Sequence, residues 1–184
     1  MQIIIGLSGA TGIIYGVRLR EVLKKQNVET HLIMTRTSEK IIQLETDLTR
    51  TDLNALATYS YGIDDLTSPI SSGSFKTDGM VVVPCSMKTL SGIATGYSSN
   101  LLLRAADVTL KERRRLVLVP RETPLSLIHI ENMYKVARAG AIVLPAMPGF
   151  YHKPKSVDDL VNHIVGKILD VFNIRHELYK RWKM

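Results

Sequence analysis

The first residues suited to chemistry lie between Gly6 and Gly12. The run reads Gly-Leu-Ser-Gly-Ala-Thr-Gly, with the hydroxyls of Ser8 and Thr11 between glycines spaced three apart. Glycines permit a tight turn and a close ligand approach, and free amides at a helix start favour a phosphate. The spacing is neither the dinucleotide pattern nor a P-loop, and no acid ends the predicted strand at 30–34 to hold a ribose. The run therefore favours a mononucleotide phosphate over NAD, with a tight turn alone as the alternative.

A second polar segment covers residues 84–92, which read Pro-Cys-Ser-Met-Lys-Thr-Leu-Ser-Gly. Three hydroxyls and Lys88 at a helix start would form a second cradle for an anion. Cys85 could act as a nucleophile, but no histidine lies at a telling position nearby. A small buried residue at a strand end is therefore the favoured interpretation of Cys85.

Two later segments add charged and aromatic groups. Arg121 offers a bidentate fork for a phosphate, and Glu122 beside it could move a proton. A surface ion pair for Arg121 and a helix-start acid for Glu122 are the alternatives. Residues 145–154 contain prolines and a glycine that fix a rigid turn, which would place Phe150 and Tyr151 over a site.

Alternating strands and helices must position these segments. Three apolar runs, at 80–83, 116–119 and 141–144, each end at a proline. Near-continuous apolar runs are typical of parallel strands buried on both faces, and proline fits best where strand pairing stops. The polar segments that follow should therefore meet at the carboxyl ends of adjacent strands, where open α/β sheets bind ligands.

The remaining elements complete one predicted domain over residues 1–184. Ser156 and Asp159 form a capping signal for a last helix, whose apolar stripe runs from Val157 to Phe172 and belongs to the core. The fold class is α/β, a three-layer Rossmann-like (flavodoxin-like) sandwich with a mostly parallel sheet. The other predicted elements are strands at 3–7 and 30–34, helices at 13–25, in two pieces over 36–57, within 91–111 and at 124–138, and a long loop at 64–78.

Composition bears on the class of protein. The chain has 184 residues, a net charge of +7 and one cysteine, which excludes an internal disulfide and a cysteine-based zinc site. No apolar run approaches the roughly 18 residues of a membrane span, and no secretory signal is evident, so a cytoplasmic protein is expected. Aromatic residues make up 6%, and the basic clusters at 111–115 and 175–183 are interleaved with acids or apolar residues. A solvated or anion-binding face is therefore favoured over a nucleic-acid partner.

Beyond these patterns, the chain resembles one family essentially from end to end. The family is the UbiX-type flavin prenyltransferases, formerly described as aromatic acid decarboxylases. The shared segments occur in one order, which makes the resemblance specific: 9–12 (GATG), 44–46 (LET), 71–75 (SSGSF), 84–90 (PCSMKTL), 104–108 (RAADV), 110–113 (LKER), 120–125 (PRETPL) and 150–152 (FYH).

The resemblance implies a reaction and its partners. Such enzymes transfer a dimethylallyl group from dimethylallyl phosphate to reduced FMN, which gains a fourth ring through bonds at N5 and C6. The prenylated FMN serves a UbiD-type decarboxylase. The family also implies a homo-oligomer, often a dodecamer with sites shared between subunits, and no metal.

The resemblance also assigns residues to roles. FMN would contact Gly9, Ala10, Thr11, Thr35, Ser86, Met87, Lys88, Thr89 and Arg121. The prenyl phosphate would be bound by Tyr151 and Lys167, with Arg104, Lys111 and Arg121 nearby. Glu122 would be the acid/base, and Thr11, Glu45 and Trp182 match further catalytic or site-lining positions.

Two residues depart from the family pattern. Many members carry serine where this chain has Thr11, which keeps a hydroxyl. Lys167 stands where arginine is familiar, and lysine keeps the charge without the planar fork; a place on the polar face of the last helix is its alternative interpretation.

Three other functions remain as alternatives. A flavin-dependent cysteine decarboxylase would show a P-x-M-N-x-x-M-W type segment and a catalytic histidine, whereas residues 145–150 read Pro-Ala-Met-Pro-Gly-Phe. An FMN-binding accessory subunit of a decarboxylase is disfavoured by the presence of Glu122, Lys111 and Tyr151. A direct aromatic acid decarboxylase lacks a chemical rationale in these residues.

Overall fold

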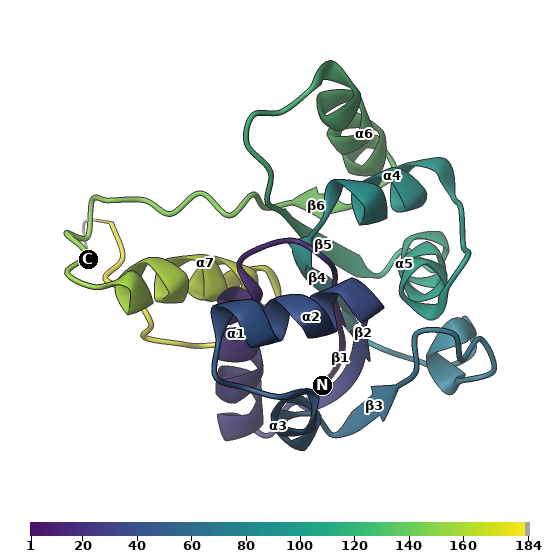
Figure 1. Cartoon of the computed structure of the whole chain (residues 1–184), viewed down its shortest axis with the longest axis horizontal. Helices are drawn as coiled ribbons and strands as arrows, with labels where there is room; N and C mark the ends of the chain where they lie inside the picture. Colours follow the sequence, from purple (N-terminus) through teal and green to yellow (C-terminus); the bar gives the residue numbers. More distant parts are fainter. Residues whose placement is uncertain (183–184) are drawn as a thin grey trace.

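A six-stranded parallel sheet forms the centre of the computed structural model, which describes residues 1–182 (Figure 1). The strand order is β3-β2-β1-β4-β5-β6, and every neighbouring pair is parallel. Without the short edge strand β3, this order is that of flavodoxin-like folds, so the predicted fold class is confirmed. The strands are β1 (Gln2–Leu7), β2 (Glu29–Met34), β3 (Tyr59–Tyr61), β4 (Gly79–Cys85), β5 (Arg115–Pro120) and β6 (Ile142–Val143).

Helices cover both faces of the sheet (Figure 1). One face packs against α1 (Ile13–Lys25), α2 (Arg36–Glu45), α3 (Arg50–Leu56) and α7 (Val157–Val171). The other face packs against α4 (Met87–Thr95), α5 (Leu101–Lys111) and α6 (Leu127–Arg138). Two separate apolar cores result, one on each side of the sheet.

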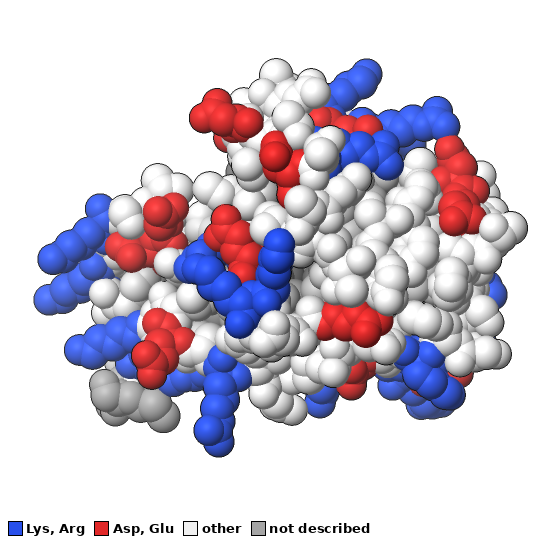
Figure 2. Space-filling model, turned by 90° about the horizontal axis from the view of Figure 1, so that it is seen from below, with Lys and Arg blue, Asp and Glu red and all other residues white. Residues whose placement is uncertain are grey.

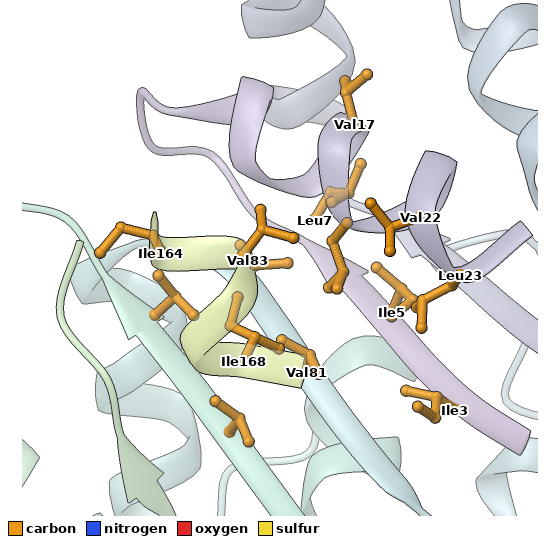
Figure 3. Packing of buried hydrophobic residues seen from close by; sticks show 14 of the residues in the cluster. Ile3, Ile5, Leu7, Val17, Val22, Leu23, Val81, Val83, Ile164 and Ile168 are labelled. Atoms are coloured by element: carbon orange, nitrogen blue, oxygen red, sulfur yellow. The ribbon is translucent and has the colours of Figure 1, made fainter. Parts of the chain in front are cut away.

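Alternation along the strands divides the side chains between these cores. Ile3 and Ile5 of β1 lie in the core under α1 and α7, whereas Ile4 lies in the core under α4 and α5. Figure 3 shows the first core, in which β1 and β4 side chains meet Val17, Val22 and Leu23 of α1 and Ile164 and Ile168 of α7. The predicted burial on both faces is confirmed for the runs at 80–83 and 116–119, whereas Ile142 in the edge strand β6 (Ile142–Val143) is exposed.

The capping signal of the last helix is also confirmed. Ser156 Oγ accepts a hydrogen bond from the Asp159 amide at 3.2 Å, and Asp159 Oδ2 accepts one from the Ser156 amide at 3.1 Å. These reciprocal bonds satisfy two amides that lack helical partners. Most of the predicted stripe is buried, although Val157 itself is exposed.

Pro120 ends its strand as predicted, whereas Pro84 does not. β4 continues through Pro84 to Cys85, and its pairing with β5 shifts register between Val82 and Cys85. Pro84 has no amide hydrogen to donate, but it lies within this register shift, where the regular ladder of strand hydrogen bonds is interrupted. β5 ends at Pro120, and the run at 141–144 forms only the two-residue strand β6, which stops before Pro145.

Three further boundaries differ from the prediction. β3 was not predicted, because its side chains are mostly exposed and carry no apolar pattern. α4 begins at Met87 rather than within 91–111. The predicted loop at 64–78 includes a 3-10 turn over Pro69–Ser71 whose Ile70 is buried in the second core.

Candidate active site at the carboxyl ends of the central strands

Ser8 joins the two turns that leave β1 and β4 at the point where the strand order reverses. Its amide and hydroxyl both donate to the Pro84 carbonyl, at 3.2 and 2.9 Å, and its hydroxyl accepts from the Ser86 amide at 2.7 Å. Ser8 is fully buried. We expected a ligand donor at Ser8, but its hydroxyl is occupied in holding these turns together.

The turn from β1 to α1 does bind an anionic group, as its amides predict, but that group belongs to the protein. The Glu45 carboxylate, at the end of α2, accepts from the Gly12 amide at 2.9 and 3.2 Å and from the Ile13 amide at 3.0 Å. Gly12 has a φ of 95°, which favours glycine. At Gly9 the requirement is space, because a Cβ would lie 2.6 Å from Thr37 Cγ2.

The hydroxyls at the other carboxyl ends cap helices. Thr35 Oγ1 accepts from the Ser38 amide at 3.1 Å at the start of α2. Ser86 Oγ accepts from the Thr89 amide at 3.3 Å at the start of α4, and donates to Thr89 Oγ1 at 3.1 Å. These caps place both helix starts at the ligand-binding edge of the sheet.

Arg121 is the charged group with the clearest unmet need at this edge. Its amide donates to the Cys85 carbonyl at 3.3 Å, which fixes the β5 turn beside the β4 turn. Its guanidinium Nε is buried without a hydrogen-bond partner. A buried N–H donor without an acceptor costs free energy of folding. This nitrogen is therefore suited to donate to an anionic oxygen of a ligand. Glu122 beside it is exposed and accepts from the Thr123 amide at 3.1 Å.

Cys85 has the environment of an inert residue. The side chain is fully buried, and desolvation raises the pKa of its thiol to about 12. A thiol with such a pKa remains protonated at neutral pH and is a poor nucleophile.

A cluster of aromatic rings forms where the segment before α7 meets the C-terminal tail. The Tyr151 hydroxyl lies 3.4 Å from His163 Nε2, and the rings of Tyr151 and Trp182 meet edge to face at 5.3 Å. His163 Nδ1 accepts from the Gly149 amide at 3.2 Å, and the His152 ring stacks on His163 at 5.2 Å. Figure 1 shows that the segment before α7 and the end of the tail lie side by side. We refer to Tyr151, His163, Tyr179 and Trp182 as the aromatic cluster.

Sequence reasoning did not identify His163. It lies within the apolar stripe of α7, where a histidine is easily assigned to the core, and its side chain is indeed largely buried. Burial first, and then the nearby His152 and Lys167, lower the pKa of His163. The neutral ring that accepts from Gly149 carries its proton on Nε2, so this nitrogen donates to Tyr151. The Tyr151 hydrogen is then free to point toward a ligand.

The arrangement of helices and turns matches known proteins over the full length of the chain. A family profile described as Flavoprotein matches residues 1–169. The flavin prenyltransferase UbiX of Methanocaldococcus jannaschii is 52% identical over 182 residues, which are 99% of this chain and 98% of the relative. The chain belongs to the UbiX-type flavin prenyltransferases.

Two solved UbiX-type structures have nearly the same fold. A dodecameric FMN-dependent UbiX-like decarboxylase from Escherichia coli O157:H7 superposes with a TM-score of 0.98 at 51% identity, and the match covers 100% of both chains. AnUbiX (PadA1), in complex with FMN and dimethylallyl pyrophosphate, superposes with a TM-score of 0.98 at 49% identity, over 100% of this chain and 97% of that one.

A single chain does not bring together all the residues that were predicted to bind the prenyl phosphate. Arg104 and Lys111 lie on α5, on the opposite face of the sheet from α7, which carries Lys167. They line an open cavity of about 580 Å³ together with residues 71–74, Lys76 and Glu112. Arg104 pairs with Asp107 at 2.7 Å, and Lys111 pairs with Glu112. This basic cavity therefore lies apart from Tyr151 and Lys167, with which Arg104 and Lys111 were predicted to bind the prenyl phosphate.

Lys167, the departure from the UbiX-type pattern, is half exposed and lies one turn before the end of α7. Its ammonium lies 3.9 Å from Asp170 Oδ2, and its charge contributes to lowering the pKa of His163.

Two further observations concern the described part of the chain. Among residues 1–182, no group of three or more His, Cys, Asp or Glu side chains is arranged to hold a metal ion, and no helix is long and apolar enough to cross a membrane. On the face seen in Figure 2, Lys and Arg side chains lie in separate groups with Asp and Glu among them.

Proposed function

We propose that this chain transfers a dimethylallyl group from dimethylallyl phosphate to reduced FMN and so makes prenylated FMN. The observation that carries the proposal is the buried, unpartnered Nε of Arg121 beside the turns of β1 and β4. A buried guanidinium nitrogen without a partner can donate to an anionic oxygen, and both proposed substrates carry a phosphate. Membership of the UbiX-type family gives the class of reaction.

The proposed FMN site follows the carboxyl ends of the strands. Gly9, Ala10 and Thr11 provide the first turn, Thr35 the second, and Arg121 the last. Ser86, Met87, Lys88 and Thr89 provide the start of α4. Reduced FMN supplies N5 and C6 as the atoms that form the new bonds. The residues named above would orient the flavin, and the hydrogen bonds of the buried Ser8 hold the β1 and β4 turns together.

Departure of the phosphate is the step in which the protein's charges act. The ester C–O bond would break as the bond at N5 forms, and the phosphate would leave with negative charge that Lys167, Arg121 and the Tyr151 hydroxyl stabilise. The bond at C6 would form by addition to the allyl double bond, with loss of the C6 hydrogen as a proton and gain of a proton at the neighbouring alkene carbon. The ring faces of Tyr151 and Trp182 suit the positive charge that develops on the allyl group. Glu122 accepts the proton released at the flavin and passes it to the phosphate. Thr11 and Glu45 line the opposite side of this site in our proposal.

The separation of Arg104 and Lys111 from Lys167 leads us to propose a homo-oligomer. A neighbouring copy would bring its α5 cavity to the α7 side of this chain and complete the phosphate site. α6 presents large apolar side chains to solvent, among them Leu127, Ile128 and Tyr134 at 62–70% exposure, which an interface would cover. A dodecamer, the state named for the Escherichia coli relative, is the assembly we propose.

Three further proposals accompany the activity. Prenylated FMN is made for a UbiD-type decarboxylase, residues 1–184 act as one domain, and the protein resides in the cytoplasm. The location stays a prediction from the sequence.

The decisive experiment is anaerobic incubation with reduced FMN and dimethylallyl phosphate, or with the diphosphate, followed by mass spectrometry of the released flavin. The flavin should gain the mass of one C5H8 unit with at least one donor. Unchanged flavin mass with both donors would rule out the prenyltransferase proposal. FMN binding without this gain would favour the accessory-subunit alternative, and decarboxylation of a C-terminal cysteine peptide would favour the cysteine decarboxylase.

A further inference from the structure

Asp170, in the last turn of α7, is the most heavily bonded carboxylate of the C-terminal region. It accepts from the Tyr179 hydroxyl at 2.7 Å, from His176 Nε2 at 3.0 Å, and from the guanidinium of Arg181 at 2.6 and 3.3 Å. Lys167 stands 3.9 Å away on the same helix. The three hydrogen-bonding partners all belong to the tail that follows α7, so one carboxylate ties the tail to the helix.

These bonds decide the charge of Asp170. Burial alone would raise the pKa of its carboxyl, but hydrogen bonds from Arg181, Tyr179 and His176 outweigh burial and lower the pKa to about 2. The carboxylate is therefore charged under all ordinary conditions. Each charge-assisted bond is stronger than a neutral one, and the group as a whole fixes the path of the tail.

The tail then runs back along α7 toward the aromatic cluster. Tyr179 lies against Gly166, where a Cβ would come within 2.5 Å of its ring, and it meets the His163 ring at 4.9 Å. Trp182, next to Arg181, meets Tyr151. A chain of contacts thus leads from Asp170, which is not among the residues proposed to bind either substrate, to Tyr151 and Trp182, the two rings proposed to lie beside the allyl group.

We propose that Asp170 is a positioning residue, which fastens residues 174–182 to α7 and thereby keeps Trp182 against Tyr151. Its effect on turnover rests on the proposed function, whereas its effect on the tail does not. The competing explanation is that apolar packing alone docks the tail, since Ile174 is buried and Leu178 packs against the first core.

Trp182 gives a direct readout, because it is the only tryptophan in the chain. The Asp170→Asn substitution keeps the size of the side chain but removes its charge. Its amide NH2 group would face the donors of Tyr179 or Arg181, so at least one of these hydrogen bonds is lost. We expect Trp182 emission to shift to the red, its quenching by acrylamide to increase, and its anisotropy to fall. The KM for dimethylallyl phosphate should rise about tenfold, the effect of losing a charged hydrogen bond, with little change in FMN affinity.

A matched control is Glu177→Gln, which removes the same charge from an exposed position of the same tail. It should leave fluorescence and KM at wild-type values. Arg181→Gln breaks the ion pair from its exposed side, and it provides the test if Asp170→Asn fails to fold. Thermal melting and FMN titration show whether each variant retains the fold.

A double-mutant cycle separates positioning from a general structural role. If Asp170 acts through Trp182, Asp170→Asn should raise KM much less in a Trp182→Ala background than in the wild type. Unchanged quenching and KM in both Asp170→Asn and Arg181→Gln would overturn the proposal, as would fully additive effects in the cycle. If no prenylation is observed with the wild type, the fluorescence arm still decides whether Asp170 docks the tail.

Discussion

The turns at the carboxyl ends of β1, β4 and β5 and the aromatic cluster near α7 form two halves of the proposed site, and they are built differently. In the first half, bonds from backbone amides to side chains of the same chain fix the turns, as in the bonds from Gly12 and Ile13 to Glu45. In the second half, side chains from the segment before α7, the helix itself and the tail meet ring to ring. The first half suits a bulky phosphorylated flavin, and the second suits a small allylic group.

This difference predicts distinct failures. Changes in the turns should affect chemistry or FMN affinity and leave Trp182 fluorescence unaltered. Changes in the aromatic cluster should alter the KM for the prenyl donor, or the pH dependence of stability, and leave FMN affinity unaltered. A variant in one half that altered the readout of the other half would show that the two halves act as one cooperative unit.

The largest effect is expected from Glu122→Gln in the first half. The amide keeps the shape of the carboxylate but cannot accept a proton, so kcat should fall about 100-fold while FMN still binds. Single-turnover kinetics with prebound reduced FMN measures this loss. Glu131→Gln on α6 is the control and should retain wild-type kcat. An unchanged rate in Glu122→Gln would remove its role as acid/base.

A somewhat smaller effect is expected from Arg121→Met. Loss of the guanidinium should weaken FMN binding about 30-fold, as for a truncated partner of a buried charge pair. The melting temperature without ligand should hold or rise, because a buried nitrogen without a partner is removed. Flavin titration and thermal melting test the two parts. A large drop in melting temperature would show that Arg121 has a structural role instead. The control is Arg115→Met, which removes a guanidinium from an exposed position.

The two halves also differ in how well the sequence predicts them. The turn at Gly6–Gly12, the buried strands and the Ser156–Asp159 cap depend on residues close in sequence, and local patterns predict them correctly. The occupation of the α1 amides by Glu45 joins residues 32 and 33 positions apart, and no local pattern encodes it. The meeting of Tyr151 with Trp182 depends on how the tail folds back, which the residue types alone do not specify.

The proline-terminated strands show a similar limit. A proline predicts where regular pairing stops, yet β4 continues through Pro84 because the register shift leaves no amide required there. β3 was missed because an exposed edge strand carries no apolar signal. In both cases the neighbouring strands, rather than the segment itself, determine the structure.

A moderate effect is expected from His163→Gln in the second half. Burial, His152 and Lys167 lower the pKa of His163 below the ordinary 6.5. The unfolded chain then binds a proton that the folded chain does not, so the free energy of unfolding falls as the pH drops through and below that value. Protonation would also turn Nδ1 into a donor and break the bond from the Gly149 amide, in a cluster that Tyr151 and Tyr179 also face.

His163→Gln should therefore weaken the dependence of stability on pH below about 6.5, as measured by denaturant unfolding at a series of pH values. His31, whose pKa burial also lowers, should account for part of the remaining slope. His129→Gln is the matched control, because exposed His129 likewise accepts a backbone amide at 3.3 Å. A slope identical to that of the wild type would mean that His163 titrates alike in the folded and unfolded chains.

The smallest effect is expected from Lys167→Arg. Lys167 is half exposed and only loosely paired with Asp170, so a longer cation fits without displacing a buried group. The planar fork could bind the phosphate through two bonds, so kcat/KM for dimethylallyl phosphate should stay within about twofold of wild type or improve. Lys167→Met, which removes the charge, should raise KM and leave FMN affinity unchanged. If Lys167→Arg instead abolished activity, the compact ammonium would be a specific adaptation of this chain, and the aromatic cluster would tolerate only one geometry around Tyr151.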